Sequence, residues 1–162
     1  KLQGFTLEKV VYEGVPQPRD LHFGALCALG RSDIALFMVE TGSIPAGVDS
    51  RDRIGCTPTY LASFCGLKEV LSALIEAGAD INLAVKDGHT PLYSASQKGH
   101  LEVVRELLRG GANVDQAEKD GATPLFMASQ EGHVEVVHEL LRGGPSINQA
   151  EKDGCTSLYM AS

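Results

Sequence analysis

Cysteine is the residue type in this sequence best suited to nucleophilic or metal-binding chemistry. The chain contains four cysteines, Cys27, Cys56, Cys65 and Cys155, which lie far apart and form no Cys-x-x-Cys pair. No histidine stands at zinc spacing from them, and a nucleophilic thiol would need a nearby base and orienting group, neither of which is apparent. The pattern therefore predicts neither a zinc site nor a dense disulfide framework, and it fits a reducing, intracellular (cytoplasmic) compartment.

Two histidines, His100 and His133, recur at matching positions. A catalytic site needs a unique constellation of residues, so recurrence favours a structural role near the start of a helix. The sequence also shows no phosphate-binding loop, no Gly-x-Ser-x-Gly elbow and no paired-carboxylate motif. We expect no catalytic residue, no bound metal and no cofactor, and therefore no enzyme within this chain.

Composition narrows the class of partner. The 162 residues are 43% apolar and 22% charged, which is typical of a globular protein. The formal net charge of -7 argues against nucleic acid, whose binders carry a clustered basic footprint, although a local basic patch stays open. No apolar run approaches the roughly 18 residues that a membrane span needs, so we expect no membrane insertion.

A 33-residue repeat is the strongest pattern in the chain. The motif Asp-Gly-x-Thr-Pro-Leu begins at residues 87 and 120, and it returns at 153 with Ser157 in place of the proline. Residues 87–119 and 120–152 are identical at 23 of 33 positions. A looser copy, Gly55-Cys56-Thr57-Pro58, precedes them in the same register. Units this small cannot bury a core alone, so they must stack on one another.

Each copy predicts a turn followed by two helices. Thr90 suits an N-cap and Pro91 the first helical position, where a missing N–H costs nothing. Gly99 suits a C-cap with positive φ. The second helix carries an apolar stripe at Leu101, Val104, Leu107 and Leu108. The Asp-Gly pair of the next copy then indicates a tight turn.

These motifs resemble the ankyrin-repeat family over roughly residues 20 to 162. The resemblance implies an all-α repeat solenoid of helix-turn-helix units and β-hairpin loops, in a right-angled, L-shaped stack. It also implies that partners bind the concave face formed by first helices and hairpin tips. The motifs that carry it are Gly88-x-Thr90-Pro91-Leu92, Ala95-Ser96, Gly99-His100, the run Val103, Val104, Leu107, Leu108, and Gly111-Ala112-Asn113-Val114-Asp115.

The sequence departs from the family pattern at several positions. The usual histidine after Thr-Pro-Leu is Tyr93, Phe126 and Tyr159 here. The hydrogen bond which that histidine commonly supplies between repeats should therefore be absent or replaced by aromatic packing. Pro145 replaces an alanine and should stiffen the exit from its helix.

The repeats predict a division of the chain that begins with a degenerate unit. Three extra residues, including Pro45, lie between Gly42 and Gly55, so the first hairpin should be enlarged. We expect a fragment of a longer array. Its segments are a linker or the end of a preceding element at 1–19, a degenerate N-terminal repeat at 20–52, repeats at 53–85, 86–118 and 119–151, and the truncated start of a further repeat at 152–162.

Candidate binding residues lie at hairpin tips and at the ends of first helices. The Lys-Asp-Gly turns would form a ladder of alternating charge, although turn chemistry and solubility explain them equally well. His89 falls where the family places a variable, outward-facing residue, and Phe64 is the candidate aromatic anchor. Between two near-identical repeats, Lys98 is exchanged for Glu131. The candidates are Arg53, Ile54, Cys56, Phe64, Lys86, Asp87, His89, Gln97, Lys98, Lys119, Asp120, Gln130, Glu131, Lys152 and Asp153.

These features favour a protein-interaction scaffold with another protein as its partner and no small-molecule substrate. The alternative is a regulatory or substrate-targeting array of a larger enzyme, such as a kinase or ubiquitin ligase, whose catalytic domain lies outside the sequence. A spacer is the third possibility, favoured by the near-identity of two repeats. The fold alone does not name a partner.

One further resemblance concerns asparagine modification. Leu74, Asp80, Ile81 and Asn82 match the spacing seen in ankyrin repeats that resemble substrates of asparaginyl hydroxylases. Ordinary repeat consensus explains the same residues, and we favour that interpretation.

Overall fold

The computed structural model describes residues 23–44 and 47–145, and every structural statement below refers to them. Lys152, Asp153, Cys155, Ser157 and Tyr159 lie outside the described residues, as do the segments 1–19 and 152–162. The described part contains eight helices: α1 (Phe23–Ala28), α2 (Ser32–Glu40), α3 (Pro58–Phe64), α4 (Lys68–Glu76), α5 (Pro91–Lys98), α6 (Leu101–Arg109), α7 (Pro124–Gln130) and α8 (Val134–Arg142).

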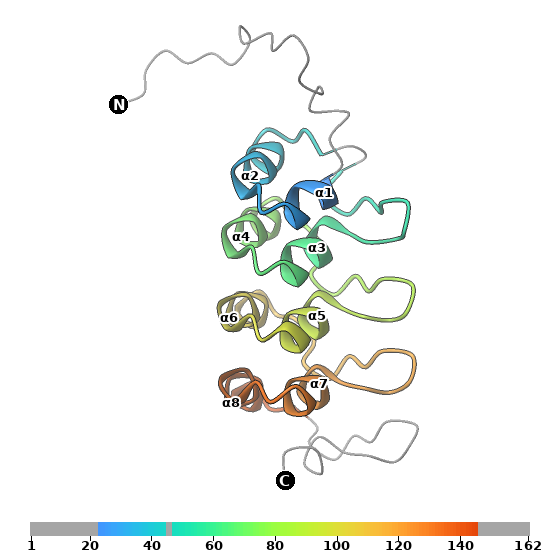
Figure 1. Ribbon diagram of the computed structural model, residues 1–162, viewed down its shortest axis with the longest axis vertical. Coiled ribbons are helices and arrows are strands. Elements are labelled where there is room, and N and C mark those ends of the chain that lie inside the picture. The colour runs from blue at the N-terminus through green and yellow to red at the C-terminus, as the bar shows by residue number, and fades with distance from the viewer. Residues whose placement is uncertain (1–22, 45–46, 146–162) are drawn as a thin grey trace, which may run out of the picture.

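The helices form two parallel rows (Figure 1). The first helix of each pair (α1, α3, α5, α7) contributes to an inner row, and the second (α2, α4, α6, α8) to an outer row, with each helix packed on its neighbours in the same row. Long loops project sideways from the inner row, which gives each unit its L-shaped outline. This confirms the predicted all-α solenoid. The described loops contain no strand and are closed by turns, with Val85 N–H donating to the His89 carbonyl at 3.0 Å.

Threonine and proline start three of the four inner helices. In each, the threonine side chain accepts a hydrogen bond from the backbone N–H three residues later, and proline occupies the first turn, as the sequence predicts. The pairs are Thr57 with Tyr60 at 3.2 Å, Thr90 with Tyr93 at 3.0 Å, and Thr123 with Phe126 at 3.2 Å.

A continuous apolar core runs between the two rows. In α6 the predicted stripe is confirmed, because Val104 and Leu107 are fully buried and Leu101 and Leu108 are half-buried against them. Val70, Leu71 and Leu74 of α4 and Val136 and Leu140 of α8 are also buried, whereas Val134 and Leu141 of α8 are exposed. Burying one such side chain contributes about 1.5–3 kcal/mol, so each repeat gains most of its stability from its neighbours.

A second, smaller cluster lies at the base of the hairpins. It consists of Tyr93, Ala122, Phe126 and Met127, all buried. Tyr93 and Phe126 occupy the positions at which the family usually has histidine. The prediction of aromatic packing at these positions is therefore confirmed.

The first helix pair is present, although its sequence is degenerate. Gly24 stands where later repeats carry Tyr60 and Tyr93, and a Cβ at this position would lie 3.0 Å from Leu61 Cδ1. The missing aromatic ring thus allows α1 to approach α3 closely. Pro45, in the hairpin predicted to be enlarged, lies outside the described residues. The residue boundaries assigned to the repeats stay predictions.

Candidate functional site

A histidine from the following repeat holds the end of two inner helices. His100 Nε2 donates to the Phe64 carbonyl at 3.1 Å, and His133 Nε2 donates to the Gln97 carbonyl at 3.0 Å. The imidazole rings lie against glycines, since a Cβ at Gly66 or Gly99 would come within 2.8 or 2.7 Å of a ring atom. We call each arrangement a histidine clasp. The structural role predicted for His100 and His133 is confirmed.

Each clasp needs glycine for a second reason. Gly66 and Gly99 adopt left-handed φ values of +74° and +73°, which L side chains rarely occupy. Gly99 is the αL cap of α5, as predicted.

Phe64 is exposed at the clasped end of α3. Its side chain is 40% exposed, and its ring stacks with Tyr60 at a centroid distance of 6.3 Å. Lys98 Nζ lies 4.8 Å from the Phe64 ring centroid, where the negative face of the ring attracts a cation. The structure therefore brings together two predicted site residues from different repeats. Their proximity was not predicted.

The surface around Phe64 changes character along the stack. In the first repeat, Ala28 occupies the position of Phe64 and Leu29 that of Cys65. Both are exposed, Leu29 to 76%. In the last two repeats the same positions hold half-buried Gln97 and exposed Lys98, then Gln130 and Glu131, both exposed. These equivalent positions are thus apolar in the first repeats and polar in the last two.

Carboxylates shape two of the hairpin tips. Asp52 Oδ1 accepts from the backbone N–H groups of Ile54 at 3.0 Å and Cys56 at 2.8 Å. Glu118 Oε1 accepts from those of Asp120 at 2.8 Å and Ala122 at 3.1 Å. Sequence analysis missed both residues. The available signal was an acidic residue three positions before the turn glycine, which the middle hairpin replaces with Val85.

Basic residues connect neighbouring hairpins. Arg51 donates to the Gly55 carbonyl at 2.9 Å in its own hairpin and to the Ala84 carbonyl at 2.8 Å in the next. The predicted charge ladder has one rung among the described residues, between Lys119 Nζ and Asp87 Oδ1 at 3.8 Å. Both side chains of that rung are exposed, so the ion pair contributes little to stability.

Arg53 and Ile54 lie at the first described tip, and Lys86 lies in the next hairpin. All three are exposed, and Ile54 is 72% exposed. The stem of Lys86 lies across this tip, because a Cβ at Gly55 would be 3.3 Å from Lys86 Cε. The Lys86 ammonium is thus held close to the preceding hairpin.

A comparison with known families now identifies the repeat. A family model described as ankyrin repeats (3 copies) matches residues 21–118 and 107–162. This chain belongs to the ankyrin-repeat family. No curated protein matches the sequence. Ankyrin repeats are generally protein–protein interaction modules and are typically non-catalytic.

The chemistry of the described cysteines agrees with this family. Burial raises the pKa of the Cys27 thiol to about 12, and burial also raises the pKa of Cys56 and Cys65, with the Asp52 charge adding to the effect at Cys56. A raised pKa disfavours the thiolate, which is the nucleophilic form. Cys27 is buried in the core.

His89 is less free than its expected place at an ankyrin hairpin suggests. It is half-buried, and its ring stacks on Tyr93 with a centroid distance of 4.5 Å and an interplanar angle of 8°. One face of the ring is therefore covered, so the expected outward orientation is only partly met.

The described residues contain no group of three or more His, Cys, Asp or Glu side chains placed to hold a metal ion. None of the helices within 23–44 and 47–145 combines the length and apolar character required to cross a membrane.

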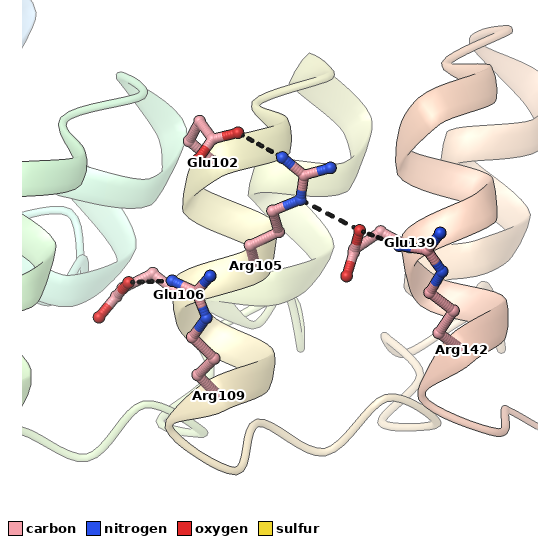
Figure 2. Close-up of polar contacts among 6 residues, drawn as sticks. All are labelled: Glu102, Arg105, Glu106, Arg109, Glu139 and Arg142. Atoms are coloured by element: carbon pink, nitrogen blue, oxygen red, sulfur yellow. Dashed lines mark hydrogen bonds and ion pairs between the residues drawn. The ribbon is translucent and has the colours of Figure 1, made fainter.

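The outer row of the ankyrin stack pairs its own charges. Figure 2 shows Arg105 of α6 between Glu102, at 2.6 Å, and Glu139 of α8, at 3.1 Å. Glu139 also contacts Arg142 at 3.2 Å. The four side chains form one network across the last two described helix pairs.

Asn82 is built into the contact between two ankyrin repeats. Its Oδ1 accepts from Asn113 N–H at 2.8 Å, and its own N–H donates to Asp80 Oδ1 at 2.9 Å. This geometry gives the residue a structural role. Its modification stays a hypothesis, and an unchanged intact mass after treatment with an asparaginyl hydroxylase would count against it.

Proposed function

We propose that this array binds another protein through its inner face, the surface formed by the C-terminal ends of α3, α5 and α7 and by the hairpin tips. The observation that carries the proposal is Phe64, which is 40% exposed on a clasped helix end with Lys98 Nζ 4.8 Å from its ring. Aromatic side chains dominate the energetics of protein interfaces. An exposed aromatic ring beside a cation offers both an apolar and an electrostatic contact at one point.

Preorganisation supports this choice of face. The clasp at Gly66 fixes the backbone that carries Phe64, and the Asp52 carboxylate fixes the tip that carries Arg53 and Ile54. A surface fixed in advance loses less conformational entropy on binding. On the outer face, by contrast, the charges of Glu102, Arg105 and Glu139 are already paired with one another.

The proposed contact residues are the predicted candidates that lie within the described part of the chain. We propose a binding role without catalysis, in an intracellular compartment suggested by the cysteine spacing. A regulatory or targeting array of a larger enzyme would use the same face for the same step. The residues are Arg53, Ile54, Cys56, Phe64, Lys86, Asp87, His89, Gln97, Lys98, Lys119, Asp120, Gln130 and Glu131.

A matched pair of variants tests the proposal. The inner-face variant carries Phe64→Ala, His89→Ala and Lys98→Ala, and the outer-face control carries Glu69→Ala, Glu76→Ala and Glu135→Ala at exposed positions. We expect a protein from native lysate that is retained by the parent and the control and lost by the inner-face variant. Circular dichroism verifies that both variants are folded. Equal retention by the two variants would contradict the proposal.

A further inference from the structure

The two ends of the inner face differ in charge. At the N-terminal end, Arg51, Arg53, Lys86 and Lys98 outnumber the carboxylates of Asp52 and Asp87. At the C-terminal end, Glu118, Asp120 and Glu131 outnumber Lys119. A gradient from positive to negative therefore runs along the stack, although the whole chain carries a net charge of -7.

The carboxylates at the basic end are already engaged. Asp52 accepts two backbone hydrogen bonds at its own tip, and Asp87 lies 3.8 Å from Lys119. Arg53, Lys86 and Lys98 are exposed. Within 23–44 and 47–145 no ion pair engages these three cations, so they can pair with an incoming anionic group.

An exposed apolar side chain lies beside the cations at two places on the basic end. Ile54 follows Arg53 at the tip across which the Lys86 stem packs, and Phe64 lies under the Lys98 ammonium. Single apolar residues flanked by cations suit a linear segment in which acidic and apolar side chains alternate. A flat globular interface would instead need a contiguous apolar core.

We propose that the basic end of the inner face binds a linear segment of a partner protein that carries acidic residues next to an aromatic or aliphatic anchor. This proposal rests on the binding function proposed above and specifies its ligand. Carboxylates of the segment would pair with Arg53, Lys86 and Lys98, while its apolar side chains would pack on Ile54 and Phe64. Repulsion by Glu131 and Glu118 would keep the acidic part of the segment at the N-terminal end of the stack.

Selection from random peptides tests the ligand class without assuming a sequence. A phage-displayed library of peptides of about 12 residues is selected on the whole chain, and enriched peptides are synthesised for fluorescence anisotropy. We expect enrichment of peptides that combine Asp or Glu with Leu, Ile, Phe or Trp. Their affinity should fall with added NaCl, because exposed charge pairs are screened.

Variants then locate the peptide on the face. Arg53→Glu with Lys86→Glu, and separately Phe64→Ser, should each weaken binding about tenfold or more. Lys68→Glu, which introduces the same type of reversal at the start of α4 on the outer face, should change it less than about twofold. Thermal unfolding of every variant shows whether a loss of affinity reflects a loss of fold.

Three outcomes would overturn the ligand class. They are enrichment of basic peptides, no enrichment over a protein-free control, and tighter binding of a single-stranded oligonucleotide than of any selected peptide. None of these three outcomes would change the result of the lysate experiment, in which the parent retains a protein and the inner-face variant does not. Failure of this inference is thus distinguishable from failure of the proposed function.

Discussion

The first repeat boundary differs from the two later ones in how the inner helices are joined. At the later boundaries His100 and His133 reach back to the preceding helix end. At the first boundary the matching residue is Leu67, and no atom lies within 4 Å of a Cβ placed on Gly30. The three later repeats are therefore joined by a specific polar contact that the first boundary lacks.

Other contacts hold the first repeat in place. Phe23, Leu26 and Cys27 are buried in the shared core, and Gly24 allows close packing against Leu61. Polar contacts across this boundary come from the hairpin, where Arg51 donates to the Ala84 carbonyl. A repeat array can therefore lose the clasp at one end while it keeps its core and the polar contacts between neighbouring loops, which are present at the later boundaries as well.

The largest expected effect concerns the burial of Cys27. Its pKa of about 12 makes the thiolate fraction at pH 8 roughly a thousandfold lower than for a thiol at the ordinary value. We expect iodoacetamide to label Cys27 at least about a hundredfold more slowly than Cys56 or Cys65, as measured by peptide mass spectrometry. Because thiolate accumulates as pH rises toward the pKa, the Cys27 rate should increase throughout pH 7–10. Labelling as fast as that of Cys56 would show that the first repeat is not docked.

Glycine substitutions compare the boundaries in free energy. Gly66→Ala and Gly30→Ala carry the same backbone cost, about 1–2 kcal/mol, because both glycines have positive φ. Gly66→Ala also displaces the His100 ring, so we expect a total loss of about 3 kcal/mol in urea unfolding, compared with about 1 kcal/mol for Gly30→Ala. Equal losses would mean that the clasp contributes nothing to stability.

Removal of the clasp histidine should have a smaller effect. His133→Ala should lower the free energy of unfolding by about 1 kcal/mol through the lost hydrogen bond to the Gln97 carbonyl. The double variant His133→Ala with Gly99→Ala should lose less stability than the sum of the two single losses, because the ring that would clash with the new Cβ is absent. A strictly additive result would show that the glycine and the histidine contribute to stability independently.

A smaller effect on stability is expected for the ion pair that links the last two described repeats. Arg105 and Glu139 join α6 to α8, whereas the corresponding pair at the preceding boundary is Ser72 and Glu106. A double-mutant cycle with Arg105→Ala and Glu139→Gln should give a coupling of about 0.5 kcal/mol, reduced in 1 M NaCl. The pair of Arg109 and Glu106, within one helix, serves as the control. A coupling insensitive to salt would contradict the electrostatic explanation.

The smallest effect concerns a column of buried small residues. Ser96 Oγ finds no hydrogen-bond partner among the described residues, whereas Ser129 Oγ donates to the Leu125 carbonyl at 2.9 Å. Ser96→Ala should leave stability unchanged or raise it by about 0.5 kcal/mol, and Ser129→Ala should lower it by a similar amount. Cys27 fills this column in the first repeat. Differential scanning calorimetry measures both changes, and destabilisation by Ser96→Ala would show that its hydroxyl is satisfied.

Local sequence predicted the features that depend on residues within one repeat. The Thr90 cap, the Gly99 cap and the apolar stripe of α6 were all predicted, because each follows from spacings of about three to nine residues. The solenoid followed from the repeat period. Phe64 was predicted to be the anchor and is exposed, but whether it binds a partner stays a prediction.

Contacts between repeats could not be predicted in the same way. The clasp joins residues 36 positions apart, and Arg51 reaches a carbonyl 33 positions away. Which side chains meet across such distances depends on the rise and rotation from one repeat to the next, and the period alone does not specify these. The proximity of Lys98 to Phe64 was missed for the same reason.

The histidine clasp has a consequence for how such an array can change length. The repeat at 86–118 carries both Gly99, which receives a ring from the next repeat, and His100, which supplies one to the preceding repeat. Excision or insertion of a whole 33-residue unit by in-frame recombination brings an equivalent glycine and histidine together at the new junction. The number of repeats can thus vary without creating a mismatched contact between neighbours. A new binding surface can be assembled by recombining repeats whose contacts are already compatible.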